Sequence, residues 1–261
     1  MSDSQSGNMT MNSNLEGKTA IVTGGGRDIG RACALRLAAA GAAVAINYHN
    51  SGEGADSAAN QIVAAGGNSF SQQGDMTSDD DVAKLITKTL SELSNRIDIV
   101  VHVTGGLVAR RTLEEMEIDH WNRVMDLNAT SFLRVVKCAV PHMTNGGSIV
   151  GFASQAGRDG GGPGAMAYAA SKGTVMTMTR GLAKELGPAI RVNSVCPGMI
   201  DTDFHNVFTK PEVRKHVANI TPLKREGSSE DVANLVAYLA SDQAAFVTGA
   251  NIDINGGTFF S

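Results

Sequence analysis

Lys18-Thr-Ala-Ile-Val-Thr23-Gly24-Gly-Gly-Arg-Asp-Ile-Gly30 is the stretch of sequence that decides the fold. Its first part is rich in apolar and β-branched residues, which predicts a buried strand, and the glycines after Thr23 predict a tight turn. The alanine- and leucine-rich run over 31–40 predicts a helix, which Gly41 ends. Glycines let backbone N–H groups approach a pyrophosphate at the start of such a helix, although a simple tight turn has the same composition.

The rest of the chain alternates between strand and helix patterns. Strands are expected at 42–46, 69–72, 97–103, 148–152, 190–196 and 251–254, and helices at 54–65, 78–93, 118–143, 165–186 and 228–240. Strands that are apolar throughout are typical of a parallel sheet covered on both faces. We therefore expect an α/β fold, a single-domain Rossmann-type doubly wound parallel sheet with helices on both faces, over residues 15–261. Residues 1–14 are polar and are expected to form a disordered tail.

Composition excludes several classes of function. The chain has 261 residues and a formal net charge of -4, with no block of lysines and arginines, so no nucleic-acid partner is expected. The start of the chain lacks the features of a secretory signal, and no run is long and apolar enough to cross a membrane. We therefore expect a cytoplasmic protein without a membrane partner. The wide spacing of Cys33, Cys138 and Cys196 argues against a disulfide framework and against a metal site.

Tyr168 and Lys172 stand one helical turn apart in the expected helix 165–186, so the phenol and the ammonium share one helical face. A nearby cation lowers the pKa of a tyrosine, which is about 10 when unperturbed. Such a phenol can give a proton to a carbonyl oxygen or take one from an alcohol. A tyrosine–lysine pair is common on helix surfaces, but Ser154 follows a strand at the edge where ligands bind. Asn128 is a polar amide in an otherwise apolar helix, which requires a partner.

In order and context, Asn128, Ser154, Tyr168 and Lys172 resemble the catalytic tetrad of the short-chain dehydrogenase/reductase family. Thr23, Gly24 and Gly30 resemble its glycine fingerprint, and the resemblance spans residues 16–258. It points to the 3-oxoacyl-[acyl-carrier-protein] reductases, glucose dehydrogenases and small carbonyl reductases of that family. The resemblance implies hydride transfer with a nicotinamide dinucleotide, Tyr168 as general acid and base, and a water held by the asparagine that links the lysine to solvent. It also implies a homotetramer built through 118–143 and 165–186.

The expected cofactor-binding residues follow the strands of the sheet. They are Thr23, Gly24, Gly26, Arg27, Ile29, Gly30, Asn47, His49, Asn50, Ser51, Asp75, Met76, Thr104, Gly105, Tyr168, Lys172, Pro197, Gly198, Ile200 and Thr202. The family resemblance implies an adenine contact for Asp75 and a contact of the Ile200 main chain with the nicotinamide carboxamide. It implies that Thr202 contacts either the nicotinamide amide or the phosphates. No carboxylate follows the second strand until Glu53, where an acid would bind the ribose 2′-OH of NAD. Because Arg27 also adds a positive charge, we expect NADP(H) rather than NAD(H), with a solvated surface charge as the alternative for Arg27.

Two positions depart from the family pattern. Asp28 stands where the middle glycine of the fingerprint belongs, and we expect it to turn away from the pyrophosphate by capping the following helix. His102-Val103-Thr104-Gly105 replaces Asn-Asn-Ala-Gly after the fourth strand. Gly105 keeps the backbone room that a cofactor needs. We expect His102 to be a structural residue of a buried strand rather than a catalytic group.

The function expected from these residues is reduction of a ketone, a 3-oxoacyl group or an aldehyde, on a small substrate that is free or carrier-bound. One alternative is NAD-dependent oxidation of a sugar or polyol, and another is an inactive nucleotide-binding regulator. The region 203–222 is expected to cap the site, and Phe204 and Phe208 predict a partly apolar pocket. A glycine-rich stretch at 157–164 is expected to flex on the other side. Lys210, Arg214 and Lys215 fit either an acidic carrier or a solvated helix face.

Overall fold

A computed structural model describes residues 14–261, apart from the side chains of 144 and 145. Its centre is a seven-stranded sheet with the order β3-β2-β1-β4-β5-β6-β7, in which each neighbouring pair is parallel. The strands are β1 (Thr19–Thr23), β2 (Ala43–Tyr48), β3 (Ser69–Gln73), β4 (Ile97–His102), β5 (Met143–Phe152), β6 (Ile190–Pro197) and β7 (Asn251–Ile254). The expected tail lies outside the described residues, except for Asn14.

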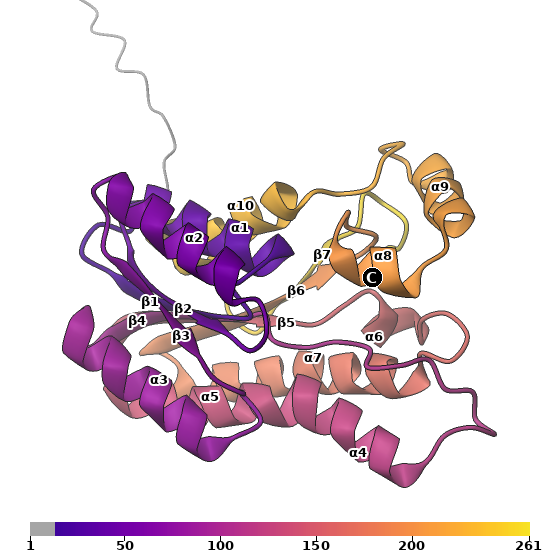
Figure 1. Ribbon diagram of the computed structural model, residues 1–261, viewed down its shortest axis with the longest axis horizontal. Helices are drawn as coiled ribbons and strands as arrows, with labels where there is room; N and C mark the ends of the chain where they lie inside the picture. Colours follow the sequence, from indigo (N-terminus) through magenta and orange to yellow (C-terminus); the bar gives the residue numbers. More distant parts are fainter. Residues whose placement is uncertain (1–13) are drawn as a thin grey trace, which may run out of the picture.

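Helices cover both faces of the sheet (Figure 1). On one face lie α1 (Asp28–Ala39), α2 (Gly52–Ala64) and α10 (Ser229–Ala240), and on the other lie α3 (Asp79–Glu92), α4 (Ile118–Met125), α5 (Ser131–Ala139) and α7 (Met166–Leu186). Two buried apolar clusters result, because side chains alternate between the two faces of each strand: Ala20 and Val22 belong to one cluster, and Ile21 belongs to the other. The expected doubly wound α/β fold is confirmed.

The strand order reverses at β1, whose neighbours are β2 and β4. In open parallel sheets, ligands bind beyond the carboxyl ends of the strands at such a reversal. The segments that follow the strands at this edge are the glycine loop after β1, α6 (Ala156–Asp159) after β5, and α8 (Asp203–Phe208) and α9 (Pro211–Ile220) after β6. In Figure 1, α8 and α9 lie beyond the ends of β6 and β7, over the edge where the site is expected.

The prediction of one long helix over 118–143 is wrong at its C-terminal end, and it does not include the π-helical turn in the middle of this region. A π-helical turn, η1 (Asp126–Thr130), separates α4 from α5, and a short 3-10 turn, η2 (Val140–His142), follows α5. Met143 already belongs to β5 and pairs with Ile97. Pro141 explains the end of the helix, because proline lacks an N–H and blocks the helical path before it. The other long helix is confirmed, since α7 begins one residue after the expected start.

Candidate active site

A cavity of about 740 Å³ opens at the carboxyl ends of the strands. The residues predicted to bind cofactor or substrate mostly line it: Gly24, Gly26, Arg27, Ile29, Gly30, Asn47, His49, Asn50, Ser51, Asp75, Met76, Thr104, Gly105, Ser154, Tyr168, Lys172, Pro197, Gly198, Ile200 and Thr202. Thr23 and Asn128 do not line it, and both lie buried behind its wall. Segments distant in sequence therefore meet in one open site.

Tyr168 and Lys172 project from α7 into this cavity, and Ser154 faces them from the end of β5. The Lys172 ammonium Nζ lies 5.6 Å from the centre of the Tyr168 ring and donates a hydrogen bond to the carbonyl oxygen of Phe152 at 2.8 Å. Lys172 is only 4% exposed, and this carbonyl compensates part of the cost of burying its charge. The predicted pairing of phenol and ammonium on one helical face is present.

The expected lowering of the Tyr168 pKa is wrong for this arrangement. Burial raises the pKa of the phenol to about 12, even though the Ser154 hydroxyl favours the ionised form. Burial also lowers the pKa of Lys172 to about 8. The main cause is burial, because removal of both groups from water disfavours charge on each, while Nζ is held by a backbone carbonyl and lies over the phenol ring. At neutral pH the phenol therefore keeps its proton and the lysine keeps its charge.

Asn128 reaches the site through the backbone of the loop after β4. Its side-chain oxygen accepts a hydrogen bond from the N–H of Gly106, and its Nδ2 donates to the carbonyls of Gly106 and Val124, each at 2.9 Å. The π-helical turn holds the amide in this position. A Cβ on Gly105 would lie 2.6 Å from the Asn128 oxygen and 3.0 Å from Lys172 Nζ, so only glycine fits between the two side chains. Asn128 thus supports the wall beside Lys172.

His102 is confirmed as a buried structural residue of β4. It is 2% exposed, and burial is the main reason that its pKa falls to about 3, with the charge of Lys172 adding to the effect. Nδ1 lies 3.0 Å from the Thr23 hydroxyl, and Nε2 lies 3.0 Å from the Ser131 hydroxyl. Because Ser131 donates its own proton to the Leu127 carbonyl, its oxygen accepts from Nε2–H.

The tautomer of His102 follows from these contacts. With the proton on Nε2, Nδ1 accepts from the Thr23 hydroxyl, whose oxygen in turn accepts from the N–H of Thr104 at 3.3 Å. One directed chain of hydrogen bonds therefore joins the end of β1, the loop after β4 and the π-helical turn that carries Asn128. We call Thr23, His102, Ser131 and Asn128 the site floor. The imidazole occupies the position of the first asparagine of the family motif.

Asp28 lines the cavity and contacts the start of α8, and the expected helix cap is wrong. It is the first residue of α1, with a φ of 47°, and the N-cap residue is Arg27, which makes no side-chain cap bond. The Asp28 carboxylate instead accepts a hydrogen bond from the N–H of Asp203, the first residue of α8, at 3.3 Å. A non-glycine residue at this φ is strained, which reflects the glycine that the family pattern has here. Arg27 lies 3.5 Å from the Asp203 carboxylate.

Asn47 is predicted from the sequence to be a hydrogen-bond donor to the cofactor at the end of β2, but it supports the glycine loop instead. Asn47 is 1% exposed, and its Nδ2 donates to the carbonyl of Gly74 at 3.0 Å, while its oxygen faces the N–H of Gly24 at 3.4 Å. Its amide therefore braces the glycine loop instead of offering a free donor, which corrects the prediction. Burial raises the pKa of Asp75, but hydrogen bonds from Thr77 outweigh this effect and lower it overall. Asp75 is therefore an ionised carboxylate at the edge of the cavity.

The glycines of the cavity wall support the prediction that a dinucleotide fits here. A Cβ on Gly30 would lie 2.1 Å from the Gly24 carbonyl oxygen, and one on Gly26 would lie 2.4 Å from the Ser51 carbonyl oxygen. These contacts leave no room for a side chain at either position, so the loop packs closely against Ser51 and against its own first turn. Pro197, Gly198 and Ile200 line the opposite wall after β6.

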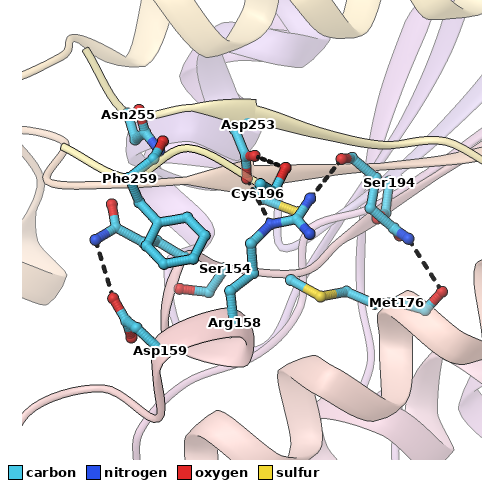
Figure 2. Close-up of polar contacts among 12 residues, drawn as sticks. Ser154, Arg158, Asp159, Met176, Ser194, Cys196, Asp253, Asn255 and Phe259 are labelled. Atoms are coloured by element: carbon cyan, nitrogen blue, oxygen red, sulfur yellow. Dashed lines mark hydrogen bonds and ion pairs between the residues drawn. The ribbon is translucent and has the colours of Figure 1, made fainter. Parts of the chain in front are cut away.

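The segment that carries Ser154 is fixed to the last strand. Figure 2 shows the Arg158 side chain reaching from α6 toward Asp253 of β7. Arg158 Nε lies 2.7 Å from the Asp253 carboxylate, and its Nη2 donates to the Asn251 carbonyl at 2.7 Å. Both charged side chains are less than one-fifth exposed, so this ion pair holds α6 more firmly than a surface pair would. The stretch expected to flex over 157–164 therefore begins in an anchored helical turn.

The region 203–222 contains α8 and α9, the lid of the site, which caps the cavity as expected. The Phe204 ring lies 5.8 Å from the Tyr168 ring and 5.2 Å from the Phe208 ring, centre to centre, although Phe208 itself does not line the cavity. Arg214 is not a solvated or carrier-facing charge: it pairs with Glu226 at 2.6 Å and with Asp201 at 2.5 Å. Ion pairs with residues on either side of the segment therefore hold the lid.

The sequence analysis missed several residues of the substrate half of the cavity. They are Leu107, Arg110, Gln155, Asp159, His205, Thr209, Val213, Val217, Ile220 and Thr258. Leu107 and Arg110 follow β4, and their place after a strand end was the one available signal. The others come from α6, the lid and the C-terminal loop, whose packing over the site no local pattern encodes.

The fold and the cavity together are typical of a dinucleotide-binding α/β protein, with a tyrosine and a lysine on the cavity wall. A family model described as Enoyl-(Acyl carrier protein) reductase matches residues 24–258. The chain belongs to the short-chain dehydrogenase/reductase family, which confirms the resemblance, and it is an oxidoreductase of that family. Within the described residues, no helix combines the length and apolarity needed to span a bilayer.

Characterised and solved relatives cover nearly the whole chain. It is 36% identical to the 3-oxoacyl-[acyl-carrier-protein] reductase FabG of Staphylococcus aureus (strain Mu50 / ATCC 700699), over 93% of this chain and 98% of the relative. A dehydrogenase/reductase from Sinorhizobium meliloti 1021 superimposes with a TM-score of 0.88 at 36% identity, covering 94% of this chain and 96% of that one. A short chain dehydrogenase from Burkholderia cenocepacia J2315, solved in complex with NADP, has a TM-score of 0.86 at 32% identity, covering 94% and 98%.

Proposed function

We propose that this protein is an NADP(H)-dependent reductase that converts a ketone, 3-oxoacyl group or aldehyde to an alcohol. When bound, the nicotinamide supplies the hydride. Tyr168 gives its proton to the carbonyl oxygen, and the Ser154 hydroxyl donates a hydrogen bond to the same oxygen and shares the developing charge. Lys172 keeps positive charge beside the phenol as the proton leaves, and Asn128 holds the wall next to it.

The observation that carries the proposal is the joint placement of Ser154, Tyr168 and Lys172 on one open cavity walled by the glycine loop. The resting protonation state suits proton donation, because a phenol whose pKa is raised to about 12 keeps its proton at neutral pH and can give it to a carbonyl oxygen. An NAD-dependent sugar or polyol dehydrogenase is the weaker candidate, because no carboxylate stands between Asn47 and Ser51 to bind the ribose 2′-OH of NAD.

The preference for NADP(H) rests on Arg27 and on the end of β2. Arg27 lines the cavity at the glycine loop, and no carboxylate stands between Asn47 and Ser51, which also line it. A carboxylate at that point would repel a 2′-phosphate. His49, Asn50 and Ser51 add neutral donors. Dissociation constants for NADPH and NADH, measured by quenching of protein fluorescence, test this preference. Arg27→Ala should weaken NADPH binding about tenfold and leave NADH unchanged.

Turnover of a ketone panel with NADPH, in wild type and in Tyr168→Phe, tests the reaction itself. Loss of the proton donor should reduce kcat about 10²- to 10⁴-fold while the dissociation constant for NADPH stays the same. Equal rates in the two proteins would instead favour an inactive nucleotide-binding regulator. The reduction rate should also fall as pH rises above about 8, because Lys172 then loses the charge that supports the departing proton.

We further propose a cytoplasmic homotetramer that takes a small or carrier-bound substrate. Apolar side chains remain exposed on the helices expected to assemble: Ile118 is 72%, Leu133 is 46% and Met166 is 44% exposed. Exposed apolar groups on neighbouring helices are typical of an oligomer interface. Light scattering coupled to size-exclusion chromatography should give four copies for wild type and fewer for Leu133→Asp.

A further inference from the structure

Arg110 places a positive charge in the substrate half of the cavity. Its Nη1 donates to the Pro163 carbonyl at 2.8 Å, and its Nε and Nη2 donate to the Phe208 carbonyl at 3.3 and 3.2 Å. The guanidinium therefore spans the opening between the glycine-rich segment after α6 and the end of lid helix α8. Three of its five N–H groups are used, which leaves one on each terminal nitrogen.

The charge of Arg110 is not balanced by the protein. Both of its partners are neutral carbonyls, and no aspartate or glutamate of residues 14–261 lies within ion-pair distance of it. Gly162 lies beside it, since a Cβ there would be 3.6 Å from Nη1, and the Gly162 N–H has no hydrogen-bond partner among the described residues. Both residues line the cavity, so their unused donors belong to the same wall.

The backbone just before Arg110 is strained, and this strained turn sets the direction in which the chain enters Arg110. Val108 has a φ of 64°, which is rare for a β-branched residue, and the N–H of Ala109 donates to the Leu107 carbonyl at 2.8 Å across it. Leu107 is 3% exposed, so the segment is anchored on one side by burial and on the other by the Arg110 hydrogen bonds. Strained backbone conformations cluster at functional sites, where the surrounding structure holds them in place.

The other titratable groups in the substrate half of the cavity favour a monoanion as the group that meets Arg110. Lys172 is held by the Phe152 carbonyl at the reaction centre. His205 is neutral, because burial lowers its pKa to about 4 and the charges of Arg214 and Arg110 add to the effect. The Asp159 carboxylate also lines the cavity, where it accepts from Gln155 Nε2 and from the N–H of Gly161. In this half of the cavity, the Arg110 cation with the Asp159 carboxylate suits a single negative charge better than a phosphate dianion.

We propose that Arg110 binds a carboxylate of the substrate and that the physiological substrate is an oxo acid. The carbonyl lies at Tyr168, an apolar spacer passes Phe204, and the carboxylate takes the two free N–H groups of Arg110 and the N–H of Gly162. A guanidinium recognises a carboxylate through two parallel hydrogen bonds. This inference rests on the proposed reductase function, and it names the substrate class of that site.

A comparison of acids with their esters tests the assignment. Methyl-ketone acids of increasing chain length and their methyl esters are assayed with NADPH and the full-length protein. Wild type should favour the acid over the ester about tenfold in kcat/KM at one chain length or more. Arg110→Gln should lose about tenfold for that acid and less than about twofold for its ester, because only the acid uses the charge. For that acid, the kcat/KM of Arg110→Lys should lie between the values of wild type and Arg110→Gln.

Arg111→Gln is the matched control. Arg111 is an exposed neighbour outside the cavity, and its N–H bond to the Gly164 carbonyl does not involve its side chain. Arg111→Gln should leave kcat/KM unchanged for both the acid and the ester. Equal losses for acid and ester in Arg110→Gln would overturn the proposal and make Arg110 a brace for the lid. A wild-type preference for the ester at every chain length would overturn it as well.

Calorimetric binding separates this inference from the proposed function. The oxo acid and its ester are titrated into Tyr168→Phe loaded with NADPH, with and without Arg110→Gln. Weaker acid binding in the double variant, with ester binding unchanged, supports the carboxylate site even if no ketone is turned over. Turnover of neutral ketones without any Arg110-dependent discrimination would leave the reductase function standing and refute the oxo-acid assignment.

Discussion

The site floor and the lid face each other across one cavity, but different forces hold them. The floor is buried, uncharged and joined by directed hydrogen bonds from Thr23 through His102 to Ser131. The lid is held by ion pairs of Arg214 with Glu226, which is 20% exposed, and with Asp201, which is 70% exposed. Buried hydrogen bonds resist opening because broken partners remain out of water, whereas the exposed Arg214–Asp201 pair exchanges with water at little cost. The difference predicts a rigid floor beneath a lid that opens more easily.

The largest effect is expected from breaking the floor. His102→Phe leaves the Thr23 and Ser131 hydroxyls without their buried partner, which should lower the free energy of unfolding by about 3 kcal/mol. His102→Asn, the residue of the family motif, should recover part of that loss. Urea unfolding followed by circular dichroism measures both. If His102→Phe were as stable as wild type, the hydrogen-bond chain would not hold the floor together.

Acid unfolding tests the difference between floor and lid, because His102 lies in the floor and His205 lies in the lid. The pKa of His102 is about 3 and that of His205 is about 4, both below the unfolded value of about 6.5. Between these values the unfolded chain binds more protons, so stability should fall as pH drops below about 6.5. In His102→Asn, the free energy of global unfolding should decrease less steeply as pH drops. His205→Asn should change it less, since the lid can open locally and protonate His205 without unfolding the floor.

Arg214→Ala should loosen the lid with little effect on the floor. Global stability should fall by about 1 kcal/mol or less, while KM for the ketone rises several-fold and limited proteolysis between 203 and 222 becomes faster. Lys215→Ala is the control, because Lys215 on the same helix makes no ion pair among the described residues. A drop in global stability as large as that of His102→Phe would show that lid and floor form one unit.

The smallest effect is expected at Asp28, where the glycine loop meets the lid. Asp28→Gly relieves the positive φ and removes a negative charge near the pyrophosphate position, but it loses the bond to the Asp203 N–H. These effects partly cancel, so NADPH should bind as tightly as to wild type or slightly more tightly. Fluorescence titration measures the dissociation constant. A large loss of affinity would mean that the contact between loop and lid is required for the cofactor.

Local sequence was sufficient for the fold and for most of the cofactor wall. Apolar strands such as 97–102 and the glycine loop after Thr23 carry their conformations in their own composition. The i, i+4 spacing placed Tyr168 and Lys172 on one helical face before any tertiary contact was known. Even the errors at helix ends were local, as at Pro141.

Partnerships between distant residues depended on the tertiary structure. Nothing near Asp28 in sequence indicates that its carboxylate meets the N–H of Asp203, and nothing near His102 indicates a tautomer set by Thr23 and Ser131. The same holds for the shifted pKa of Tyr168 and for the uncompensated charge of Arg110, because burial and ion pairing depend on which segments the fold brings together. Composition and spacing determined the class of chemistry here, whereas packing decided the protonation states and the shape of the substrate pocket.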